Sequence, residues 1–298
     1  DYKANTGIAT SIGHAPVAAM IDPNAGSMLA IAEALTNIIW APLTHGLKGV
    51  SLSANWMWPC KNKGEDARLY QAVETVSNFA CELGINIPTG KDSLSMTQKY
   101  GEKKVFSPGT VIISATAVTN DVRKTVSPVL INNLQSSIIY IDFSNDDYKL
   151  GGSSFYQTLN TVGSEVPTIK DVPYFKKVFN VIQKLIDEQL IIAGHDISAG
   201  GLLTTLLEMC FPSSSLGLNI NVSNIEEQDL IKILFSENPG IVIQVHYSKL
   251  AINILDKAQV RYHIIGQPTD TQQLTIKKDG LIKDFDIAAL RKIWYKTS

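Results

Sequence analysis

Two side chains that end in oxygen, Glu33 and Asn37, stand four residues apart in segment 26–40, which has the apolar periodicity of a helix. Side chains with this spacing share one face of a helix, and this face lies away from the apolar stripe. A carboxylate and an amide oxygen suit Mg²⁺, which prefers oxygen ligands and keeps phosphate and water in its shell. The alternative is a solvated polar face with a simple Glu–Asn hydrogen bond, and spacing alone leaves both open.

A second polar segment, GHDISAGG at 194–201, joins a short apolar strand to an apolar helix. Asp196 or Ser198 could cap that helix. Backbone amides at a helix start bind phosphate readily, and Asp196 would then hold a metal ion that bridges the phosphates. The alternative is a capped turn whose glycines serve packing. His195 alone is more often structural than catalytic.

The segment Gly90-Lys91-Asp92-Ser93 superficially resembles the end of a P-loop. The upstream glycine spacing of a P-loop is absent, and the segment is expected to be a turn that runs into a strand, so a P-loop is rejected. Lys91 could supply a counter-charge to phosphate. The alternative is a surface lysine in a turn, with Asp92 as its neighbour.

Two other segments have weaker signals. The loop 150–154 (LGGSS) enters a predicted helix, where backbone amides could wrap a phosphate, or it is an ordinary turn. Trp56 and Trp58 could cover a base or an interface, or they fill the core at a strand end.

The elements that position these residues alternate between strand and helix, which predicts an α/β (α+β) protein. The lapse in pattern at 123–136 places a boundary between domains 1–128 and 129–298. In the first domain we expect strands at 16–21, 48–54 and 109–118, and helices at 26–40 and 65–83. In the second we expect strands at 137–143, 190–193, 218–222, 240–246 and 271–277, and helices at 174–188, 202–210, 226–235, 248–258 and 287–296.

Composition excludes several functional classes. The 298 residues are 45% hydrophobic and 18% charged with a net charge of −2, which argues against nonspecific nucleic-acid binding. Three distant cysteines give neither a zinc motif nor a disulfide framework and favour a reducing cytoplasm. No apolar run of about 18 residues predicts a membrane span, and no signal peptide is visible. The chain starts at Asp1 without Met, so we expect a piece of a longer protein.

Taken in order, several blocks closely resemble one family: GSMLAIAEALTNI, SLSANWM, GEDARLYQAV, IPTGKDSLSM, SPGTVIISATAV, LGGSS and GHDISAGGLL. They resemble the second synthetase-like half of the large, single-chain formylglycinamide ribonucleotide amidotransferases. The resemblance implies an aminoimidazole ribonucleotide synthetase-like unit with an N-terminal barrel-forming domain and a C-terminal mixed α/β domain. It also implies the family's reaction, the ATP- and glutamine-dependent amidation of formylglycinamide ribonucleotide in purine biosynthesis.

The resemblance also implies roles for single residues. Glu33, Asn37 and Asp196 match metal ligands of an auxiliary site for ATP or ADP with Mg²⁺. Ser198 matches a nucleotide contact. Lys91, Asp92 and Ser93 match a stretch that faces the catalytic centre across the pseudo-dimer interface. A further metal-binding Asp of the family would lie upstream of Asp1.

The implied partners are the other domains of the enzyme, namely the N-terminal synthetase half and the glutaminase domain. Without them we expect an inactive chain, which could pair with a second copy through residues 1–125. One alternative is a purely structural half that binds no nucleotide. Another is a free-standing relative, such as a thiamine-phosphate kinase or a selenophosphate synthetase. Such an enzyme needs its own glycine-rich N-terminal nucleotide segment, which is not found here.

Overall fold

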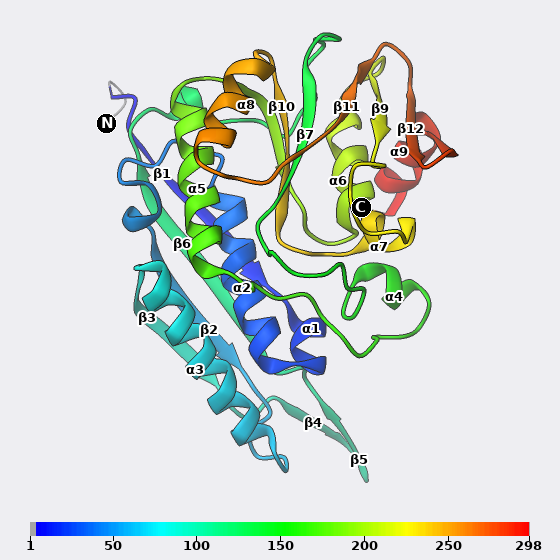
Figure 1. Cartoon of the computed structure of the whole chain (residues 1–298). Coiled ribbons are helices and arrows are strands. Elements are labelled where there is room, and N and C mark those ends of the chain that lie inside the picture. Colours follow the sequence, from blue (N-terminus) through cyan, green and yellow to red (C-terminus); the bar gives the residue numbers. More distant parts are fainter. Residues whose placement is uncertain (1–3, 298) are drawn as a thin grey trace.

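The computed structural model describes residues 4–297 as two sheets, each covered by helices (Figure 1). The first sheet has the strand order β1-β6-β2-β3, in which β2 and β3 are parallel and the other pairs antiparallel. Its strands are β1 (Gly7–His14), β2 (Ser51–Met57), β3 (Asn86–Ser93) and β6 (Thr110–Thr119). A hairpin of β4 (Thr97–Tyr100) and β5 (Lys103–Phe106) projects from it.

One face of this sheet is covered by helices. They are α1 (Pro16–Ile21), α2 (Pro23–Ile38) and α3 (Glu65–Leu83), and short 3₁₀ turns follow at η1 (Gly46–Gly49) and η2 (Val122–Lys124). The Asp22 carboxylate caps α2 by accepting the amide of Asn24 at 2.8 Å. Helix α2 lies directly on β1, because a Cβ at Gly13 would come within 2.2 Å of the Ala30 carbonyl oxygen. Only glycine permits this approach, which brings Glu33 beside the end of β1.

The second sheet has the order β13-β12-β9-β11-β7-β10-β8. Its strands are β7 (Ser137–Asp142), β8 (Ile191–Asp196), β9 (Gly217–Asn221), β10 (Gly240–Val245), β11 (His263–Thr269), β12 (Gln273–Lys278) and β13 (Leu281–Asp286). The helices are α4 (Ser154–Thr158), α5 (Val172–Asp187), α6 (Gly201–Cys210), α7 (Leu230–Phe235), α8 (Ser248–Lys257) and α9 (Ile287–Thr297).

Alternating side chains of β7 enter two separate cores. Ile139 and Ile141 pack in one core with α5 and α8, whereas Ile138 and Tyr140 pack in another with α6, α7 and the start of α9. The first core continues through α2 and α3 into the four-stranded sheet, and Phe175 of α5 lies 5.9 Å from Phe79 of α3 between ring centroids. Helix α5 therefore joins the two sheets.

The mixed α/β architecture predicted from the sequence is confirmed, and the predicted helix at 65–83 has the predicted bounds. The predicted central strand at 109–118 is β6, which lies inside its sheet. The apolar spacing of this helix predicts a buried stripe of Leu69, Val73, Val76, Ala80 and Leu83. That stripe is partly wrong, because Val73 is 43% exposed whereas Ala72 and Phe79 are buried.

Two other predictions are wrong, and several strands were not predicted. Residues 16–21 form helix α1, with Pro16 at its first turn where a missing amide hydrogen costs nothing, rather than a strand. The Gly90–Ser93 segment lies within β3, an edge strand that tolerates Pro88, rather than in a turn. Strands β1, β4, β5, β11 and β13 were not expected from the sequence. Among the described residues, no helix is long and apolar enough to cross a membrane.

Candidate nucleotide site

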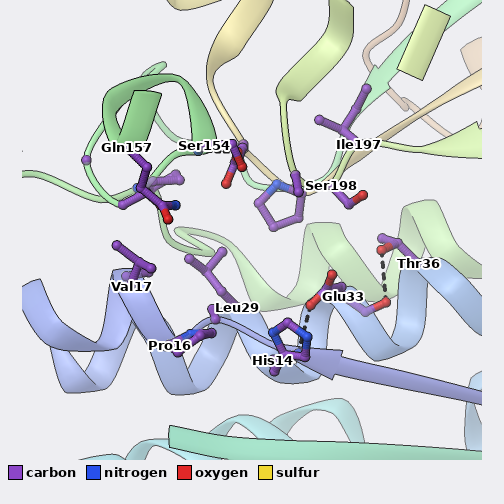
Figure 2. Close-up of a pocket in the computed structure, with 18 residues that line it drawn as sticks. His14, Pro16, Val17, Leu29, Glu33, Thr36, Ser154, Gln157, Ile197 and Ser198 are labelled. Atoms are coloured by element: carbon purple, nitrogen blue, oxygen red, sulfur yellow. Dashed lines mark hydrogen bonds between the residues drawn. The ribbon is translucent and has the colours of Figure 1, made fainter. Parts of the chain in front are cut away.

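A cavity of about 280 Å³ lies between the helices of the first sheet and two loops of the second (Figure 2). Helices α1 and α2 form one wall. The turn after β8 and the loop that precedes α4 form the other. Apolar lining comes from Pro16, Val17, Leu29, Ile197 and Pro239, and polar lining from His14, Glu33, Thr36, Ser154, Gln157, Ser198 and Glu237. The mixture suits a ligand with an apolar body and a polar end.

Glu33, which the sequence predicts to be a metal ligand, reaches the cavity from α2. Its carboxylate accepts the backbone amide of His14 at 2.7 Å. Burial raises the pKa of Glu33, and although the His14 bond opposes the shift, the charges of Asp196 and Glu237 add to it. These surroundings disfavour the ionised carboxylate, and a cation bound beside it would relieve this cost.

Asn37 lies one turn further along α2 and is exposed. Its side-chain amide donates to the Ile12 carbonyl at 3.3 Å. This bond uses the nitrogen and leaves the amide oxygen for other contacts. Asn37 is not part of the cavity lining, so its role as a metal ligand stays a prediction.

Asp196 is the last residue of β8 and is buried, and its charge acts on Glu33. It is not part of the cavity lining, so its role as a metal ligand stays a prediction. The Nδ1 atom of His195 lies 3.4 Å from its carboxylate, and Nε2 lies 3.1 Å from Glu208. Burial alone would lower the pKa of His195, but hydrogen bonds to Asp196 and Glu208 outweigh it and raise the pKa to about 10. His195 thus bridges Asp196 and Glu208 through its two ring nitrogens, in keeping with a structural role.

The turn at Ser198 lines the cavity. The sequence suggested that Asp196 or Ser198 caps α6, but neither residue does. The cap residue is Gly200, with φ of 91° and no side-chain cap bond. The amide of Gly201 donates to the Ser198 carbonyl at 3.0 Å. Within residues 4–297, no acceptor takes the amides of Ser198 and Ala199. Two backbone donors beside the Ser198 hydroxyl are therefore available to a ligand.

The loop 150–154 does not offer its amides to phosphate, so that interpretation is wrong. The amide of Gly151 donates to Glu165 O and that of Gly152 to Val162 O, both at 2.8 Å. The glycines serve packing instead, because Gly152 has φ of 78° and a Cβ there would lie 3.0 Å from the Ala18 Cα. This contact sets the loop against α1 and closes one end of the cavity.

Glu237 is a cavity residue that the sequence did not single out. One carboxylate oxygen accepts the amides of Ser154, at 2.7 Å, and of Gly200, at 2.8 Å. Burial raises the pKa of Glu237, although these two bonds oppose the shift. Only one signal in the sequence could have found it, namely an acidic residue two positions before the Pro239-Gly240 break that opens a strand.

Lys91, Asp92 and Ser93 lie on the edge strand β3, outside the cavity. Lys91 pairs with Asn55, and Ser93 with Met57, on the neighbouring strand. Trp58 is fully buried, and its indole nitrogen donates to Glu65 at 3.0 Å, so of the two open interpretations it has the core-filling role. The described residues contain no group of three or more His, Cys, Asp or Glu placed to hold a metal ion. The predicted magnesium set contains only two such residues, because Asn37 is the third.

Two family models match the chain: an FGAR-AT PurM_N-like domain over residues 1–118 and the C-terminal domain of AIR synthase related proteins over 145–279. A probable phosphoribosylformylglycinamidine synthase of Arabidopsis thaliana is 38% identical over 98% of the chain. The enzymes of Dictyostelium discoideum and Homo sapiens are 37% and 34% identical over 100% and 98% of it. The chain spans only 21%, 24% and 22% of these three relatives.

Solved structures agree on the fold. T. maritima PurL complexed with FGAR has a TM-score of 0.78 at 12% identity, covering 96% of this chain and 46% of that one. Hydrogenase maturation protein HypE in complex with ATP has a TM-score of 0.63 at 16% identity, covering 93% and 84%. The two matched domains, in this order, and the relatives that align with nearly all of the chain place it in the phosphoribosylformylglycinamidine synthase family.

Proposed function

We propose that the cavity binds an adenine nucleotide, ATP or ADP, together with Mg²⁺, and that the chain is one synthetase-like part of a phosphoribosylformylglycinamidine synthase. One observation carries this proposal. Glu33 and the Ser198-Ala199 segment come from different halves of the chain and line the same cavity, and among the described residues no acceptor takes the amides of Ser198 and Ala199. A cation could bind the Glu33 carboxylate on one wall, while phosphate oxygens accept hydrogen bonds from the amides on the other.

In this proposal Glu33, Asn37 and Asp196 contribute oxygen ligands to Mg²⁺, and Ser198 contacts the nucleotide. The metal would thereby connect α2 to the end of β8, across the two halves of the chain. The T. maritima PurL structures with ATP, ADP and AMPPCP have the same fold as this chain, which supports a nucleotide of this class.

The whole enzyme, in this proposal, amidates formylglycinamide ribonucleotide with ATP and glutamine. Lys91, Asp92 and Ser93 lie outside the cavity. In this proposal they face the catalytic centre of the N-terminal synthetase half. The chain alone is then inactive, because the reaction also needs its partners, the N-terminal synthetase half and the glutaminase domain. Its three free cysteines, Cys60, Cys81 and Cys210, support a cytoplasmic location.

Calorimetric titration of the folded chain with ADP tests the proposal. We expect saturable binding at one site in the presence of Mg²⁺ and much weaker binding with EDTA, because phosphate and carboxylates would repel each other without the cation. A folded chain that takes up neither ADP nor ATP would favour the alternative, a scaffold half with no ligand.

We further propose that the isolated chain pairs with a second copy through the outer face of the four-stranded sheet. Ile8, Ile12 and Val118 are 73%, 54% and 55% exposed on this face, and Ile8 lies directly opposite Val118. Lys91 and Ser93 extend the same face onto β3. Uncovered apolar side chains on a sheet face indicate an interface.

The pairing predicts that Ile12→Lys turns a dimer into a monomer, because it places a charge on the face that pairing would bury. Analytical ultracentrifugation of both proteins would measure this. Ile231→Lys on α7, where the side chain is 41% exposed on another part of the molecule, is the matched control and should leave the dimer intact. A wild-type chain that sediments as a monomer at its highest soluble concentration would refute the pairing.

A further inference from the structure

The segment Ser236–Asn238, between α7 and β10, connects three loops around the cavity. Its outer two side chains are buried, with exposed fractions of 3% and 2%, and reach the loop that follows β7. The side chain between them, Glu237, reaches the opposite way to the starts of α4 and α6. The segment therefore lies where the two cavity loops meet.

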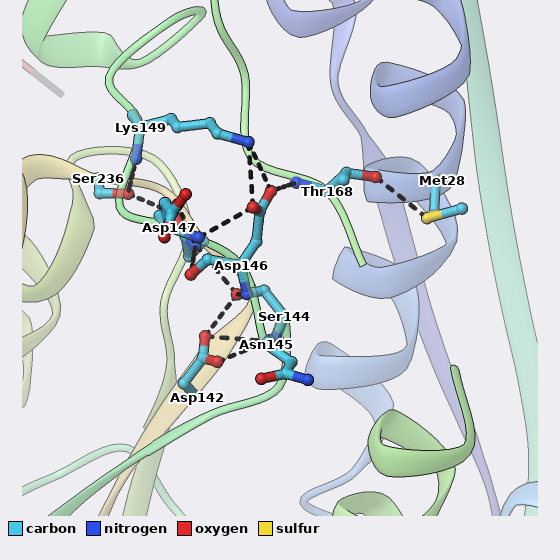
Figure 3. Close-up of polar contacts among 10 residues, drawn as sticks. Met28, Asp142, Ser144, Asn145, Asp146, Asp147, Lys149, Thr168 and Ser236 are labelled. Atoms are coloured by element: carbon cyan, nitrogen blue, oxygen red, sulfur yellow. Dashed lines mark hydrogen bonds and ion pairs between the residues drawn. The ribbon is translucent and has the colours of Figure 1, made fainter. Parts of the chain in front are cut away.

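Ser236 and Asn238 hold the loop 144–149 through the backbone of Lys149 and the hydroxyl of Ser144. The Ser236 hydroxyl donates to the Lys149 carbonyl at 3.1 Å and accepts the amide of the same residue at 3.2 Å. The Asn238 amide donates to Ser144 Oγ at 3.0 Å. Figure 3 shows this loop next to Ser236, with Lys149 turned toward Asp146.

The loop is also fixed to the other wall of the cavity. Asp146 accepts the amide of Thr168 at 3.0 Å, and the Thr168 hydroxyl lies 3.3 Å from the sulfur of Met28 on α2 (Figure 3). Because Ser236 and Asn238 are held in this way, the backbone from which the Glu237 side chain extends is fixed.

Glu237 completes the arrangement by satisfying two amides with one oxygen. The amides belong to Ser154, at the first residue of α4, and to Gly200, at the cap of α6. Neither has another partner in the described part of the chain. The backbone of α6 is held from the same side, because a Cβ at Gly201 would come within 2.7 Å of the Leu234 carbonyl oxygen.

We infer that Glu237 is a positioning residue of the nucleotide site, whose carboxylate ties the turn at Ser198 to the loop before α4 and so aims the amides of Ser198 and Ala199 into the cavity. This inference rests on the proposed function. Ser198 lies only two residues from Gly200, so loss of the Gly200 bond frees the turn that carries the ligand-binding amides. Preorganised donors bind more tightly because their ordering is complete before the ligand arrives.

Three substitutions test this inference by calorimetric titration of the chain with ADP and Mg²⁺. Glu237→Ala removes both bonds, and we expect the affinity to fall by about tenfold or more. Glu237→Gln keeps a carbonyl oxygen that can accept both amides, so its affinity should stay within about threefold of wild type. Glu237→Asp is one methylene shorter and cannot hold both loops, so its affinity should fall as in the Ala variant.

Amide hydrogen exchange in the nucleotide-free protein gives a second readout. The amides of Ser154 and Gly200 should exchange faster in Glu237→Ala and Glu237→Asp, but not in Glu237→Gln. Glu227→Ala is the matched control, because Glu227 also accepts a backbone amide, that of Asp229 at 2.9 Å, and lies outside this cavity. It should change neither the affinity nor these two exchange rates.

The outcomes separate this inference from the proposed function. A wild-type chain that binds no nucleotide overturns the proposed function. A wild-type chain that binds, together with a folded Glu237→Ala variant of equal affinity, overturns the role of Glu237 alone. If the Ala variant does not fold, the Asp variant decides, and wild-type affinity in that variant contradicts the tie.

Discussion

Replacing Glu33 by Ala should abolish the magnesium-dependent part of nucleotide binding. Changes to groups that merely orient a metal ligand already cost roughly 10- to 100-fold in affinity, so loss of a ligand should cost about 100-fold or more. Glu33 is the one carboxylate that lines the cavity from α2, and burial raises its pKa, so a cation bound beside it would favour the ionised form. Titration with ADP, with and without Mg²⁺, measures the effect.

The design separates loss of charge from loss of structure. Because Glu33 accepts the amide of His14, the Ala variant also removes a structural bond. Glu33→Gln retains an acceptor for this bond and removes only the charge, so it should fold normally and still lose the response to Mg²⁺. Glu74→Ala, on the exposed face of α3, is the matched control and should bind as wild type. Unchanged Mg²⁺ dependence in Glu33→Gln would remove Glu33 from the site.

The sequence predicted the elements whose apolar period was unambiguous. Helix α3 begins directly after Gly64 and ends directly before Gly84, whose φ of 75° suits glycine, so both ends coincide with residues that stop a helix. Segment 16–21 was read wrongly because a six-residue apolar run fits a buried strand as well as a buried helix turn. Strand β1 was missed because it alternates between small and exposed residues, and its pairing with β6 is a long-range contact.

The candidate site was predictable only where residue type carried the signal. Glu33 and Ser198 were proposed from the sequence, and the fold brings both to one cavity. The amides of the Gly151-Gly152 loop were misjudged because their partners, Glu165 and Val162, lie beyond α4 and follow no local pattern. Glu237 went unnoticed for the same reason, since its two partners lie 83 and 37 residues away in the sequence.

The second large effect should be on stability, at Gln183 of α5. This side chain is 7% exposed and links the two halves of the chain. Its oxygen accepts the Leu43 amide at 2.8 Å, and its nitrogen donates to the carbonyls of Ile39 at 2.5 Å and Ala41 at 3.1 Å. Residues 39–43 follow α2 directly, so Gln183 satisfies three backbone groups of a turn that is buried against α5.

Gln183→Leu keeps the volume of the side chain but leaves these three groups without a partner. A buried polar group left unsatisfied costs about 1–3 kcal/mol, and partial relaxation of the turn should hold the total loss of unfolding free energy to about 3 kcal/mol. Urea denaturation followed by circular dichroism measures the loss. Gln71→Leu, at an exposed position of α3, is the control and should change stability by less than about 0.5 kcal/mol.

If the two variants unfold at the same urea concentration, the link through Gln183 does not hold the halves together. Since the cavity has one wall in each half, that result would also mean that other contacts, such as the Phe79–Phe175 pair, set its width.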